Sequence, residues 1–123
     1  MEKRKLKGWI RAAISEEEKI PGDLSFVFCS DSYLLEINKQ YLQHDYFTDI
    51  ITFDYVNEGL ISGDILISVD RVRENSQQYR VEFGQELNRI MIHGVLHLCG
   101  YKDKLTKEKE IMTQKEDYYL SKW

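Results

Sequence analysis

The sequence predicts a single α+β or α/β domain in which helices cover one layer of β-sheet. Two observations support this fold class. Short β-branched and aromatic segments, typical of strands, occur between longer segments whose apolar residues recur every three or four positions, as on one face of a helix. The length of 123 residues fits one domain, residues 1–123, and no repeat, low-complexity block or linker divides the chain.

Composition narrows the function classes. Hydrophobic residues make up 42% and charged residues 31%, which is typical of a globular protein and not of a disordered one. The net charge of −4 gives no overall field that attracts nucleic acid, so any polyanion must meet a local basic patch. Cys29 and Cys99 lie far apart and predict free thiols in a reducing compartment. No apolar run is long enough to span a membrane, and the basic start lacks the apolar block of a secretion signal, so we expect a cytoplasmic protein.

The first half of the chain predicts a helix, a strand, a second helix and a second strand. After Pro21, the segment 24–30 alternates apolar and polar residues, as a strand does. Asp31 or Ser32 can cap a helix, a loop follows it, and the segment 49–55 is β-branched and aromatic. The apolar residues of the first helix fall at helical spacing: Leu6, Trp9, Ile10, Ala13 and Ile14.

The second half predicts one more strand and three helices. Two glycines within 56–63 indicate a turn, and 64–69 reads as the third strand. Helical patterns then cover 70–79, 83–99 and 106–121. Most strands are therefore separated by helices, as a sheet covered by helices requires.

The segment HGVLHLCGYKD carries two of the three histidines of the chain. On a helix, His93 and His97 point the same way and can chelate one ion. Gly100 can end the helix in the left-handed conformation and let the chain reverse, which makes Asp103 the third ligand. Two imidazoles and a carboxylate suit zinc, with a fourth position left for water. Glu86 lies seven residues before His93 on the same face and can orient a histidine from behind.

The spacing of the histidines also permits a plainer interpretation, in which two half-buried imidazoles only satisfy each other's hydrogen bonds. Gly94 stands where zinc proteases of the His-Glu-x-x-His type place their glutamate base. Peptide hydrolysis by that mechanism is therefore disfavoured, and we assign no side-chain base. A glycine here leaves room for a backbone or a substrate to approach the helix closely.

These residues resemble the motifs of the YbeY family of ribosomal RNA maturation endoribonucleases. The segment from His93 is similar to the family signature H-G-x-L-H-L-x-G-Y-D-H. TDIITFD from Thr48 resembles the family's T-D-V-L-S-F-P, and SGDILIS from Ser62 resembles G-D-I-x-I-S. Two further matches are Glu86-Leu87 and Met112-x-x-x-Glu116. The blocks occur in the family's order over about residues 33–120.

The resemblance implies a small α+β domain with a mixed sheet and a zinc-binding helix, distantly like metalloproteases. It implies a metal-dependent single-strand endoribonuclease that acts in small-subunit ribosomal RNA maturation and ribosome quality control. The implied partners are ribosomal RNA and the ribosome, and the implied cofactor is one zinc ion, with no organic cofactor. His93 and His97 match the first two family ligands. Thr48 and Asp49 match the family's T-D and either line the cleft or form a loop-to-strand turn.

Two departures from the family pattern bear on function. Without a gap, Asp103 takes the place of the family's third histidine, and Lys102 takes that of its aspartate. An insertion would instead align Asp103 with the aspartate and leave no third ligand. We prefer the ungapped alignment because aspartate is a competent zinc ligand. Leu42 stands where the family commonly has arginine. That loss, the acidic net charge and the missing base favour an alternative, a non-catalytic ribosome-assembly factor that binds RNA and has a structural zinc.

Overall fold

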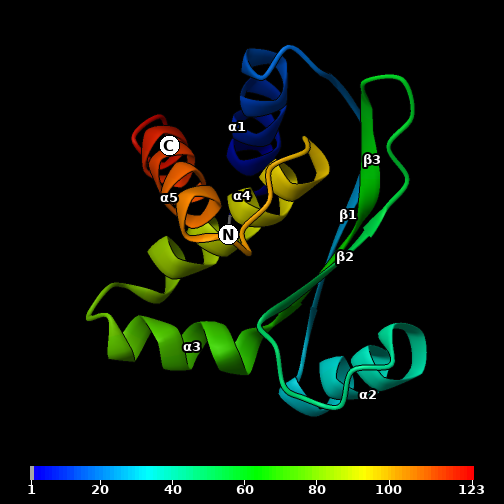
Figure 1. Cartoon of the computed structure of the whole chain (residues 1–123). Helices are drawn as coiled ribbons and strands as arrows, with labels where there is room; N and C mark the ends of the chain where they lie inside the picture. The colour runs from blue at the N-terminus through cyan, green and yellow to red at the C-terminus, as the bar shows by residue number, and fades with distance from the viewer. Residues whose placement is uncertain (1) are drawn as a thin grey trace.

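The computed structural model describes residues 2–123, which form five helices and a three-stranded sheet. In chain order the elements are α1 (Lys3–Glu16), β1 (Ile20–Cys29), α2 (Asp31–Leu42), β2 (Ile50–Asp54), β3 (Leu60–Ser68), α3 (Val69–Gln78), α4 (Phe83–Leu98) and α5 (Thr106–Leu120) (Figure 1). The α+β class expected from the sequence is confirmed. Within residues 2–123 no helix is both long and apolar enough to cross a membrane.

The sheet is mixed, with β3 in its centre. β1 pairs with β3 in parallel, whereas β2 pairs with β3 in antiparallel, so that Phe26 and Thr52 both lie opposite Ile65. Side chains alternate between the two faces of β3, as the twofold period of a strand requires. Ile65 and Ile67 belong to the main core, and Leu66 packs in a second cluster with residues of α2 and β2.

Helices α1, α4 and α5 lie on one side of the sheet (Figure 1). Helix α4 lies at the centre of the main core. Its buried residues include Met91, Ile92, Val95 and Leu96, each at most 1% exposed. A helix that is apolar over so much of its surface is packed on several sides. The two histidines of α4 are only partly buried, so they stand at the boundary between this core and solvent.

Gly94 lets α4 approach the sheet closely. A Cβ atom at this position would lie 2.9 Å from Ile50 Cδ1 and 3.0 Å from Ile65 Cγ2. Both distances are too short for ordinary carbon contacts. The close approach expected at this glycine is therefore made by side chains of β2 and β3, and it fixes the height of the histidine helix above the sheet.

Several element boundaries differ from those expected. β3 begins at Leu60, so the turn predicted over 56–63 is confined to the residues before it, with Gly59 in the left-handed region at φ +80°. Ser30 caps α2 by accepting a hydrogen bond from the Tyr33 amide at 3.1 Å, in place of Asp31 or Ser32. β1 begins before Pro21, which an edge strand tolerates because one side of its backbone needs no partner.

Candidate metal centre

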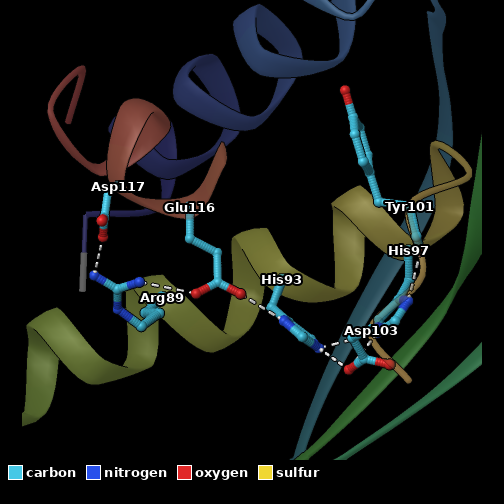
Figure 2. Close-up of polar contacts among 7 residues, drawn as sticks. All are labelled: Arg89, His93, His97, Tyr101, Asp103, Glu116 and Asp117. Carbon is cyan, nitrogen blue, oxygen red and sulfur yellow. Dashed lines mark hydrogen bonds and ion pairs between the residues drawn. The ribbon is translucent and has the colours of Figure 1, made fainter. Parts of the chain in front are cut away.

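The structure brings three side chains together at one end of α4. His93 and His97 project from the helix, and Asp103 comes from the segment that follows it (Figure 2). The two Nε2 atoms are 2.9 Å apart, and Asp103 Oδ2 lies 3.2 Å from His93 Nε2 and 3.3 Å from His97 Nε2. Among residues 2–123 this is the one cluster of three such groups with all ligand atoms within 4.8 Å.

The end of the helix explains how Asp103 reaches the histidines. Gly100 adopts φ +111°, a conformation that side chains with a Cβ rarely adopt. The Gly100 amide donates to the His97 carbonyl and the Tyr101 amide to the Leu96 carbonyl, both at 3.0 Å, which closes the last turn. The chain then reverses over the histidine face, as the glycine in the sequence predicts.

Hydrogen-bond partners fix the tautomer of each imidazole. His97 Nδ1 lies 2.9 Å from the carbonyl oxygen of Tyr101, which can only accept, so Nδ1 carries the proton. His93 Nδ1 lies 2.6 Å from Glu116 Oε2, a carboxylate that also accepts. In the neutral rings both Nε2 atoms therefore present lone pairs, and these meet a carboxylate oxygen of Asp103. Three acceptors that converge in this way could hold a cation between them.

The donor set fits zinc. Bonds of about 2.0–2.2 Å in tetrahedral geometry place two ligand atoms roughly 3.3–3.6 Å apart. The three separations of 2.9, 3.2 and 3.3 Å come close to this spacing. The ligand side chains are 18%, 24% and 39% exposed for His93, His97 and Asp103, so the centre is open to solvent on one side. These residues could hold one metal ion and leave a position for an exchangeable ligand.

A buried carboxylate contacts the Nδ1 side of His93, away from the Nε2 atom that faces Asp103. Glu116, whose side chain is 9% exposed, accepts from His93 through Oε2 and from Arg89 Nη1 through Oε1 at 2.8 Å (Figure 2). Arg89 Nη2 also donates to Asp117 Oδ1 at 2.6 Å. Burial lowers the pKa of His93, but the hydrogen bond and charge of Glu116, with Asp103 and Asp49, outweigh it and raise that pKa above its usual value.

The other residues singled out in the sequence lie around the centre in different roles. The Thr48 hydroxyl donates to the Ile50 carbonyl at 3.3 Å, a turn contact at the start of β2. Asp49 and Glu86 line a cleft beside His93, and burial raises the pKa of both carboxyls. Among residues 2–123 the Glu86 carboxyl makes no hydrogen bond to a histidine. Glu116 makes that contact, and its only signal in the sequence is the Met112-x-x-x-Glu116 resemblance.

Together, the mixed sheet and the two-histidine, one-carboxylate centre define a small α+β protein that could bind a metal ion at the end of its central helix. A family model described as Endoribonuclease YbeY matches residues 1–123, and the chain belongs to that family.

Named relatives agree with this assignment. A Parabacteroides distasonis protein named Endoribonuclease YbeY is 50% identical over 121 residues, which cover 98% of this chain and 85% of the relative. A Flavobacterium psychrophilum protein of the same name is 53% identical over 112 residues, 91% of this chain and 80% of the relative. The solution structure of a Thermotoga maritima protein matches with a TM-score of 0.69 and 29% identity, over 96% of this chain and 78% of that one.

Proposed function

We propose that residues 1–123 form one domain that is a zinc-dependent endoribonuclease for single-stranded RNA. Its role is the maturation of small-subunit ribosomal RNA and ribosome quality control in the cytoplasm, with ribosomal RNA and the ribosome as partners. One zinc ion is held by His93, His97 and Asp103. The observation that carries the proposal is the convergence of Asp103 Oδ2 with the Nε2 atoms of His93 and His97, whose ring protons lie on Nδ1. The names of the relatives support RNA as the substrate.

The residues of the chain prepare the centre for hydrolysis. When bound, zinc polarises a phosphoryl oxygen and makes a water molecule acidic enough to attack near neutral pH. Glu116 and the Tyr101 carbonyl hold the two imidazoles in the tautomer that presents Nε2. Asp103 adds a negative charge, and its partly exposed position lets a phosphodiester approach. We assign no side-chain base.

The openness of the centre favours the enzyme over a structural zinc protein. Structural zinc sites are closed by four protein ligands, whereas catalytic sites have three and an open position. Within the part of the chain that the structure describes, three ligand groups gather and no fourth joins them. The alternative of a non-catalytic assembly factor therefore has less support.

The proposal is tested by zinc content and RNA cleavage in the same preparations. We expect about one zinc per wild-type chain by elemental analysis, and zinc-dependent cleavage of single-stranded RNA. Asp103→Ala should lose most of the zinc and the cleavage. Asp45→Ala, at an exposed loop position whose only ion-pair partner within residues 2–123 is Lys39, should keep both. Wild-type protein that takes up no zinc on reconstitution would contradict the proposal. Zinc binding without cleavage of any RNA would support the assembly factor instead.

A further inference from the structure

Glu86 is a largely buried residue whose carboxyl group opens onto a cleft. The residue is 7% exposed, and within residues 2–123 its carboxyl oxygens enter no hydrogen bond and no ion pair. Among residues 2–123 no fully buried side-chain oxygen or nitrogen lacks a partner, so the Glu86 oxygens remain open to the cleft that the residue lines. The hydrogen-bonding capacity of the Glu86 carboxyl group is therefore free for a group that enters the cleft and displaces water.

The space in front of Glu86 is a cleft between α3, α4 and α5. It measures about 590 Å³, which lies in the range of small-molecule binding sites. His93 lines the same cleft, so a group bound there lies next to the metal centre. A polymeric ligand that extends from the bound group towards His93 therefore passes the metal centre. The cleft is thus placed to hold one part of a substrate whose neighbouring part reacts.

The charge of the cleft excludes a phosphate group as its occupant. Asp49, Glu86 and Glu116 contribute carboxyl groups, and the one arginine, Arg89, already donates to Glu116 and Asp117. A second metal ion is also disfavoured, because among residues 2–123 no further set of three ligand atoms converges within 4.8 Å. Neutral groups that offer N–H donors match carboxyl acceptors of this kind.

Tyr79 supplies an aromatic surface at the rim. Its side chain is 63% exposed at the C-terminal end of α3, and in the described part of the chain no ring stacks on it. Val81 beside it is 40% exposed. Unpaired RNA bases bind proteins by stacking on exposed aromatic rings and by hydrogen bonds from their edges. The cleft offers both kinds of contact.

We propose that this cleft binds one unpaired nucleobase with an exocyclic amino group, stacked on Tyr79 and selected by Glu86. A carboxylate accepts from the amino groups of cytosine and adenine. Uracil presents a carbonyl oxygen at the corresponding position, so the carboxylate repels it. This inference rests on the proposed function, because the ligand is part of an RNA substrate. It makes Glu86 a specificity-determining residue for bases near the cleavage point.

The test compares binding of short oligocytidine, oligoadenosine and oligouridine to the zinc-free full chain by fluorescence anisotropy. Wild type should bind the first two about tenfold more tightly than oligouridine. Glu86→Gln should reduce that preference to about twofold, because an amide offers both a donor and an acceptor. Tyr79→Ala should weaken all three by about tenfold through lost stacking. Glu110→Gln, an exposed substitution on α5 with the same change of charge, should behave as wild type.

Each contrary result has a separate meaning. Equal binding of all three RNAs, or a preference unchanged in Glu86→Gln, overturns the inference and leaves the proposed function standing. Loss of a second bound divalent ion in Glu86→Gln also overturns it, because Glu86 is then a metal ligand. If Glu86→Gln does not fold, unchanged binding by Tyr79→Ala at its exposed site overturns the inference. If zinc-free wild type binds none of the RNAs and zinc-loaded wild type cleaves none, both this inference and the proposed function are overturned.

Discussion

Replacing Glu116 with glutamine should weaken zinc binding without removing any zinc ligand. Glu116 accepts from His93 at 2.6 Å with one oxygen and from Arg89 at 2.8 Å with the other. Glutamine has one carbonyl oxygen and one amide group that donates, so it can satisfy either neighbour but not both. If the amide faces His93, the imidazole must change tautomer and Nε2 is no longer a free lone pair.

The expected loss of zinc affinity follows from the inability of glutamine to satisfy both His93 and Arg89. Loss of a carboxylate behind a metal-bound histidine typically lowers metal affinity by about 10- to 100-fold. Because the Glu116 side chain is only 9% exposed, water cannot easily replace the lost acceptor. We therefore expect zinc affinity to fall by about 10- to 100-fold, which corresponds to roughly 1.4–2.7 kcal/mol.

Competition with a chromophoric zinc chelator measures this affinity on folded protein, and circular dichroism checks the fold. The matched control is Asp117→Asn, which removes the charge of a carboxylate that accepts from Arg89 at 2.6 Å and does not contact His93. The control should change zinc affinity by less than about twofold. An unchanged zinc affinity in Glu116→Gln, or an equal loss in Asp117→Asn, would refute the reasoning that Glu116 orients His93.

Two further predictions concern stability. Gly94→Ala should lower the free energy of unfolding by about 1–3 kcal/mol in urea, because the new Cβ meets Ile50 and Ile65. The control is Gly8→Ala in α1. It has open space around it and should be neutral or stabilising. Equal effects would contradict the close packing of α4. The raised pKa of His93 means that protonation stabilises the metal-free protein below its ordinary pKa of 6.5. This stabilisation is lost as pH rises through the raised value, so the urea midpoint should fall above about pH 6.5, where zinc affinity should increase. A urea midpoint and a zinc affinity that both stay constant with pH would show that His93 does not titrate in this range.

The local parts of the site could be predicted from the sequence. His93 and His97 share a face because of helical periodicity. Gly100 predicts the chain reversal that brings Asp103 near them. All of these residues belong to one short segment, so their relative positions follow from backbone geometry alone. The strands were recognisable for a similar reason, because β-branched residues mark them wherever they pair.

The contacts between distant segments could not be predicted in this way. Glu116 lies 23 residues from His93 in the sequence, and only the packing of α5 on α4 brings them together. Seven residues before His93, Glu86 has the right helical phase, but it faces the cleft without a hydrogen bond to the imidazole. Periodicity gives the face of a helix on which a residue lies, but not the neighbour that covers that face. The early start of β3 was also hidden, because its pairing with β1 overrides the turn signal of nearby glycines.

The two histidines depend on different stages of chain synthesis. The proton of His97 is fixed by the carbonyl of Tyr101, within the same turn, whereas that of His93 is fixed by a carboxylate on α5, which is synthesised later. A domain generally folds as a unit, so the contact of His93 with Glu116 waits until α5 is available. A nascent chain that ends before α5 therefore carries His93, His97 and Asp103 but lacks the carboxylate that holds the His93 imidazole. If these residues hold zinc as proposed, tight zinc binding should mark a chain in which α5 has docked on α4, and a chain stalled before α5 should hold the ion only weakly.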